Sequence, residues 1–130
     1  MRTSIRLIAL LGVLALALAG CGTESGGGGG GGANGNEVDF GPTNFVQTSV
    51  TITAGQAVHF VDPQSSGGAH NICVGTSGQC DTSGKGPSAL QKPGMRLSPG
   101  DTKDVTFDTA GTYTITCTFH PSMLLTVTVQ

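Results

Sequence analysis

Three residues near the C-terminus, Cys117, His120 and Met123, carry donor atoms that suit a soft metal ion, and each lies three positions from the next. Together they offer a thiolate, an imidazole and a thioether. Sulfur and imidazole donors favour copper over hard cations such as Mg²⁺ or Ca²⁺. A second imidazole would complete a trigonal His₂Cys site with a long axial Met. His70 is the candidate for that fourth position, so the fold must bring it to the C-terminal residues.

The cysteines divide into different predicted roles. Cys73 and Cys80 enclose a short hydrophilic loop rich in Gly, and export to an oxidising compartment would favour a disulfide between them. The alternative is that both are small buried hydrophobes. If Cys21 is modified, Cys117 remains unpaired, and a free thiol outside the cytoplasm is a liability unless a group such as a metal occupies it.

Residues 1–20 are predicted to be a secretory signal peptide. Arg2 and Arg6 precede an unbroken run of apolar residues and Gly from Leu7 to Ala19. This run is too short to span a bilayer, but it fits the hydrophobic region of a signal peptide. A buried helix of the folded domain is disfavoured, because the run has no polar face and a Gly tract follows.

Residues 21–36 are predicted to tether a folded domain, residues 37–130, to a membrane. The end of the signal peptide, Leu18-Ala19-Gly20-Cys21, resembles the lipobox of bacterial lipoproteins. That resemblance implies lipidation of Cys21; without it, Cys21 would be an ordinary Cys beside a cleavage site. The Gly-rich stretch that follows is typical of a flexible coil with a span of roughly 20 Å. A phosphate-binding loop is disfavoured, because the Gly-Lys-Ser/Thr ending is missing.

The charge of the mature chain disfavours some partners. Removal of two Arg residues with the signal peptide leaves four of the six basic residues against eight acidic ones, a net charge of −4. An acidic domain does not favour nucleic acid or an anionic membrane surface.

Beyond the signal peptide, short β-branched runs divided by Gly, Pro and Asp predict an all-β sandwich. The predicted strands are residues 45–53, 57–61, 70–74, 95–97, a run through Val105 and Phe107, 112–117, and a run after Met123. Residues 75–93 are predicted to form a long loop with a helical turn near 88–91. Alternation turns His59 outward, where we expect a solvated side chain, and assigns Met95 to the core. It also places Cys117 at the core-facing end of a strand, with the threonines of that strand on the opposite face.

The order of these motifs resembles the cupredoxins, the small blue copper proteins that include plastocyanin, pseudoazurin and amicyanin. The residues that carry the resemblance are Ala54-Gly55, His70-Asn71, Gly111-Thr112-Tyr113 and Cys117-x₂-His120-Pro121-x-Met123. It covers residues 44–130, and the spacing of the ligand loop is most similar to that of amicyanin. The resemblance implies a Greek-key β-sandwich of about seven to eight strands. It also implies one type 1 copper, bound by His70, Cys117 and His120 with Met123 as the axial ligand.

The resemblance also implies partners around the ligands. Asn71 is expected to tie its loop to Thr118, and its backbone N–H to donate to the sulfur of Cys117. Phe119 stands where plastocyanin and amicyanin have Pro, so its N–H is available for a second hydrogen bond to that sulfur.

His120 is the expected electron port. In the cupredoxins the loop His reaches the surface within an apolar patch. Here Pro121 would belong to that patch, and Leu124 would either extend it or pack under a neighbouring loop. Redox proteins are the partners expected to dock there.

We therefore expect a monomeric one-electron carrier without enzymatic activity, lipid-anchored outside the cytoplasm of a bacterial cell. The alternative is an extracytoplasmic copper-binding protein for copper delivery or sequestration, which would use the same ligands. An adhesive sandwich without metal would leave the spacing of the donors incidental. A zinc site that recruits Cys73 and Cys80 would forfeit the disulfide and leave Met123 unexplained. Hydrolysis by Cys117 and His120 would lack an orienting third group.

Overall fold

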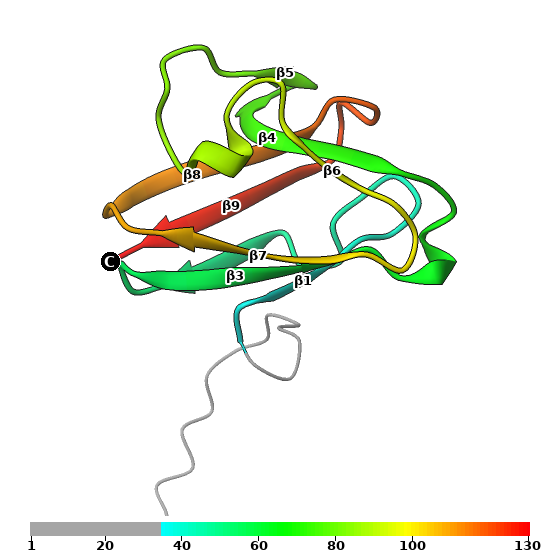
Figure 1. The fold of residues 1–130 in the computed structure, drawn as a ribbon, viewed down its shortest axis with the longest axis horizontal. Helices are drawn as coiled ribbons and strands as arrows, with labels where there is room; N and C mark the ends of the chain where they lie inside the picture. The colour runs from blue at the N-terminus through cyan, green and yellow to red at the C-terminus, as the bar shows by residue number, and fades with distance from the viewer. Residues whose placement is uncertain (1–34) are drawn as a thin grey trace, which may run out of the picture.

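The computed structural model describes residues 35–130, and these form a β-sandwich of nine strands in two sheets (Figure 1). The predicted all-β class is confirmed. The signal peptide, Cys21 and most of the Gly-rich tether lie outside the described residues. Two 3₁₀ turns, η1 (Gln64–Ser66) and η2 (Ser88–Leu90), lie in connections between strands. Within residues 35–130, no helix has the length and apolar character needed to cross a bilayer.

The smaller sheet has the strand order β1-β3-β7. It consists of β1 (Glu37–Asp39), β3 (Gln56–Val61) and β7 (Thr102–Phe107). Strand β3 pairs in parallel with β1 and antiparallel with β7. Apolar side chains alternate with polar ones along β3 and β7, so one face of each strand is buried against the second sheet.

The larger sheet contains the strands that carry the predicted donors, in the order β2-β9-β8-β4-β5, and β6 also pairs with β4. Its central strands are β4 (His70–Thr76), β8 (Gly111–Cys117) and β9 (Leu124–Val129), all joined by antiparallel pairing. The remaining strands are β2 (Ser49–Ile52), β5 (Gln79–Cys80) and β6 (Met95–Leu97). Strand β2 runs parallel to β9.

The core between the sheets is apolar and extends to the predicted metal site. The inward positions expected from alternation are buried, among them Val58, Phe60, Val105, Phe107 and Leu125. Full burial of one such side chain contributes roughly 1.5–3 kcal/mol. The same core cluster continues into two of the predicted donors, Cys117 and Met123.

Two strands escaped prediction, β1 and β5, and the count is nine rather than seven to eight. Both are too short to show a hydrophobic period. Each forms by pairing with the edge of a longer strand, β1 with β3 and β5 with β4. The predicted strand 45–53 is also shorter, because its first residue, Phe45, instead forms an isolated bridge with Phe40.

Two side chains differ from their expected surroundings. His59 is not simply solvated, because its Nδ1 lies 2.5 Å from a carboxylate oxygen of Asp104 on β7. Thr116 is fully buried although it lies on the outward face of β8. The turn between β4 and β5 covers it, and the backbone N–H of Gly78 donates to its hydroxyl at 3.0 Å.

Candidate metal centre

The predicted donors come from two neighbouring strands and one connection. His70 begins β4 and Cys117 ends β8, while His120 and Met123 lie in the connection between β8 and β9 (Figure 1). Because β4 and β8 are antiparallel and pair Ile72 with Cys117, the start of β4 meets the end of β8. Strand pairing therefore brings His70 to the C-terminal residues, as predicted.

Three donor atoms converge at this end of the sandwich. The Sγ of Cys117 lies 3.8 Å from Nδ1 of His70 and 3.8 Å from Nδ1 of His120. All three donor atoms lie within 4.8 Å of one another. His70 and Cys117 are fully buried, whereas His120 is half-buried.

These distances fit a trigonal metal site. An imidazole nitrogen at about 2.0 Å and a thiolate at about 2.3 Å from a first-row metal lie about 3.7 Å apart when the angle is trigonal. A thiol has one proton and can donate to only one of the two imidazoles. A shared metal ion satisfies all three donors at once, and this donor set suits copper.

The surroundings of His70 favour the neutral imidazole that binds metal. Burial lowers the pKa of His70, the charge of Asp62 opposes this shift, and His120 reinforces it. A ring already neutral at neutral pH loses no proton when it binds a metal. Its Nε2 has no hydrogen-bond partner among the described residues, and the same holds for both carboxylate oxygens of the fully buried Asp62.

Hydrogen bonds tie the start of β4 to the residue after Cys117. The backbone N–H of Thr118 donates to the carbonyl of Asn71 at 2.8 Å, and the side-chain amide of Asn71 donates to the Thr118 hydroxyl at 3.1 Å. The same amide donates to the carbonyl of Pro93 at 2.9 Å. The expected link between Asn71 and Thr118 is therefore present. The N–H donors to the sulfur of Cys117, from Asn71 and Phe119, stay predictions.

Backbone hydrogen bonds close the connection that carries His120 and Met123 into a turn. The N–H of Met123 donates to the carbonyl of His120 at 2.9 Å, and the N–H of Cys117 donates to the carbonyl of Met123 at 3.3 Å. The side chain of Met123 is fully buried. This backbone pairing holds three of the predicted donors in one compact turn.

Exposed apolar residues lie next to the half-buried His120 in the chain. Pro121 is exposed, and Leu124 and Phe119 are exposed to 41% and 48%. The guanidinium of Arg96 lies over the ring of Phe119, at 5.5 Å from its centroid. Sequence reasoning placed Pro121 and Leu124 in this patch but missed Arg96, because β4 brings it there through its pairing with β6.

A disulfide joins Cys73 to Cys80, and Cys117 is free and buried. Sulfurs joined in a disulfide cannot act as thiolate ligands. A zinc site that recruits both residues is therefore incompatible with this structure.

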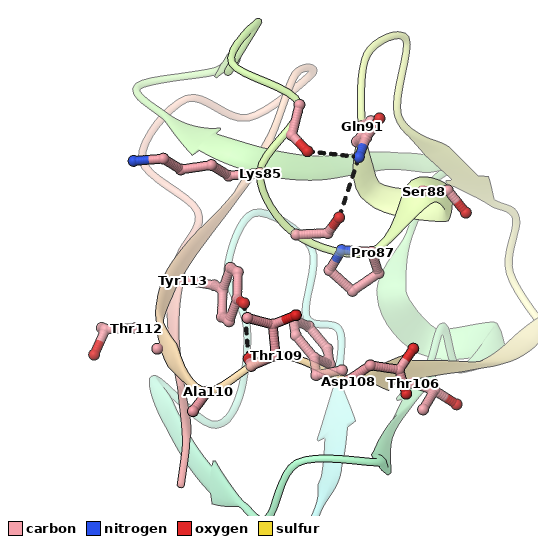
Figure 2. Close-up of a pocket in the computed structure, with 14 residues that line it drawn as sticks. Lys85, Pro87, Ser88, Gln91, Thr106, Asp108, Thr109, Ala110, Thr112 and Tyr113 are labelled. Atoms are coloured by element: carbon pink, nitrogen blue, oxygen red, sulfur yellow. Dashed lines mark hydrogen bonds between the residues drawn. The ribbon is translucent and has the colours of Figure 1, made fainter.

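A hollow of about 740 Å³ lies apart from these donors, between the segment 84–91 and the turn from β7 to β8 (Figure 2). Gln91 holds one wall by donating to the carbonyls of Gly84 and Gly86, and the hydroxyl of Tyr113 donates to the carbonyl of Thr109 (Figure 2). None of the four predicted donors lines it. The described residues that line it form no cluster of metal-binding groups, and the group that could hold a metal lies at the opposite end of β8.

The chain is similar to known copper proteins. A family model described as copper binding proteins of the plastocyanin/azurin family matches residues 33–130. Plastocyanin from Scenedesmus fuscus is 37% identical over 94 residues, which are 71% of this chain and 92% of that protein.

Solved structures of amicyanin have the same fold. Amicyanin from Paracoccus versutus gives a TM-score of 0.56 at 23% identity, over 78% of this chain and 86% of that one. The Cu(I) form of an amicyanin with one Met replaced by Gln gives a TM-score of 0.55 at 22% identity, over 75% of this chain and 85% of that one.

Proposed function

The chain belongs to the copper-binding plastocyanin/azurin family and so binds one type 1 copper, and we propose that His70, Cys117 and His120 are its equatorial ligands. The observation that carries this assignment is the convergence of their three donor atoms within 4.8 Å. We assign Met123 as the axial ligand, because its buried side chain belongs to the same closed turn.

The family consists of electron carriers, and the proposed site suits that role. Bound copper supplies a one-electron couple between Cu(II) and Cu(I). The neutral imidazoles and the thiolate can hold both states. The strand pairing and the closed turn keep the donors in place, so little rearrangement accompanies the transfer. Burial of His70, Cys117 and Met123 keeps water away from the metal.

Electrons are proposed to enter and leave through His120, the one equatorial ligand that is not fully buried. The support for this port is that Phe119, Pro121 and Leu124, close to His120 in the chain, are exposed. Family members exchange electrons with redox proteins, and an apolar surface around the port allows a partner to approach closely. We propose this patch as the docking surface of a monomeric domain.

We further propose that residues 1–20 direct export, that Cys21 carries a lipid, and that residues 22–36 tether the domain 37–130 to a bacterial cell membrane. The support for the anchor is the sequence alone. The disulfide between Cys73 and Cys80 supports an oxidising compartment, and plastocyanin-like proteins work outside the cytoplasm. Several acyl chains would anchor stably, whereas one chain binds a membrane only marginally.

The deciding experiment adds Cu(II) to the copper-free protein and records its visible spectrum. We expect an intense blue thiolate-to-copper band that disappears in Cys117→Ser. A colourless protein that retains zinc in preference to copper would overturn the assignment. Copper delivery would use the same ligands, so the electron self-exchange rate separates the two functions. Fast self-exchange supports an electron carrier, and slow self-exchange supports copper delivery.

A further inference from the structure

The hairpin of β4 and β5 lies beside the proposed copper ligands, and the family resemblance gave no role to it. Gly75 pairs with Cys80 and Thr76 with Gln79, so the two strands share only two residue pairs. The disulfide between Cys73 and Cys80 crosslinks this short hairpin. A two-stranded hairpin of this length is marginal on its own, so the crosslink is a major constraint on its tip.

The tip of the hairpin contacts the neighbours of two proposed ligands. The N–H of Gly78 donates to the hydroxyl of Thr116, the residue before Cys117, at 3.0 Å. A Cβ added to Gly78 would lie 3.0 Å from Cγ and 3.3 Å from Cα of Pro121, the residue after His120. The tip is therefore in close contact with both ends of the segment that carries Cys117 and the half-buried imidazole of His120.

The base of the hairpin is connected to the same site. Cys73 is fully buried and pairs with Thr116 across β4 and β8. The sulfur of Cys80, which carries no proton in the disulfide, lies 3.9 Å from the carbonyl of Pro93. That carbonyl accepts the amide of Asn71, which also donates to Thr118.

From these contacts we infer that the disulfide hairpin is a brace that positions the ligand loop. The crosslink fixes the hairpin, and Gly78 at its tip supports Pro121 and so limits the movement of His120. Gly78 and the disulfide are positioning elements, because neither contacts the metal donors themselves. The inference rests on the proposed function and adds to it an element that keeps the ligand geometry constant during electron transfer.

Two glycines give a matched pair of variants. Gly78 and Gly84 have nearly the same left-handed φ, 74° and 73°, so Ala imposes the same kind of backbone strain at both. A Cβ on Gly84 would meet no atom within 4 Å, whereas a Cβ on Gly78 would press on Pro121. Gly78→Ala therefore tests the contact, and Gly84→Ala controls for the strain.

The measurements are the visible and EPR spectra of the copper-loaded protein, its reduction potential and its electron self-exchange rate. We expect Gly78→Ala to shift the spectra and to slow self-exchange several-fold, while Gly84→Ala keeps the wild-type values. Thermal unfolding should occur at a lower temperature in both variants, and lower in Gly78→Ala, because only its Cβ presses on Pro121. Equal spectra and rates in the two variants would overturn the inference.

Removal of the crosslink is the second test. In Cys73→Ala/Cys80→Ala we expect the blue band to persist, a broader EPR signal and slower self-exchange; a wild-type rate and spectrum would contradict the brace. If this variant does not fold, the comparison of Gly78→Ala with Gly84→Ala tests the brace. A wild-type protein without a blue band would instead contradict the proposed function, so the two failures are distinguishable.

Discussion

The Sγ of Cys117 and Nδ1 of His70 lie 3.8 Å apart although 47 positions separate the two residues in the chain. Antiparallel pairing of β4 with β8 creates this contact, and the buried location keeps both groups out of water. Strand pairing therefore brings His70 to Cys117, and the turn after β8 supplies the other two proposed ligands. The properties of the site should respond to changes in the groups that surround it.

The first prediction concerns the backbone at position 119. Phe119→Pro removes the N–H expected to donate to the thiolate of Cys117. With less compensation of its charge, the thiolate stabilises Cu(II) more, so we expect a lower reduction potential by redox titration. Phe119→Leu keeps the N–H while it removes the ring that lies under Arg96, and serves as the control. An unchanged or higher potential in the Pro variant would contradict the hydrogen bond.

The second prediction concerns the axial position. Met123→Gln introduces a harder oxygen donor, which favours Cu(II), and should lower the potential. Met123→Leu removes the donor and should raise it. A shift of the order of 60 mV corresponds to a tenfold change in the ratio of oxidised to reduced protein. The measurement is redox titration of both variants, each with its blue band retained. Identical potentials would argue against a bond between Met123 and copper.

The third prediction concerns the buried carboxylate of Asp62. Asp62→Asn removes a negative charge that acts on His70, so Cu(II) loses stabilisation and the potential should rise by tens of millivolts, where about 60 mV equals about 1.4 kcal/mol. Asp108→Asn makes the same change in charge at an exposed position and is the control. A reduction potential that falls in Asp62→Asn but not in Asp108→Asn would refute this prediction.

The fourth prediction is a pH dependence of the copper-free protein. Burial lowers the pKa of His70 below its ordinary value of 6.5. Between the lowered pKa and 6.5 the unfolded chain binds more protons than the folded one. The free energy of unfolding therefore falls as the pH drops below 6.5. Well above pH 6.5, His70 makes the free energy of unfolding no further dependent on pH. One proton limits the slope to about 1.4 kcal/mol per pH unit.

Denaturant unfolding of the copper-free protein between pH 5 and pH 7.5, a range of about two to three units around the ordinary His value, measures this slope. We expect the slope to decrease in His70→Asn. His59→Asn is the matched control for a histidine outside the site. A slope that is equal in wild type and His70→Asn would contradict the assignment to this residue.

Short-range patterns accounted for most of the sandwich. Alternation identified the inward faces of β3, β7 and β9, because a half-buried strand repeats every two residues. It failed for β1 and β5, which pair through the edges of other strands and have too few residues to show a period. It also failed for Thr116, whose outward face is covered by a hairpin from another part of the chain.

The sequence by itself determined which donors are available, their chemical type, and the spacing of Cys117, His120 and Met123, since these are properties of residue identity and local order. It also indicated the family. Only the tertiary structure decided that Nδ1 of both imidazoles faces the same sulfur, that Arg96 lies over Phe119, and that the tip of the disulfide hairpin rests on Pro121. Those contacts depend on strand register and on packing between segments distant in the chain, which no local pattern encodes.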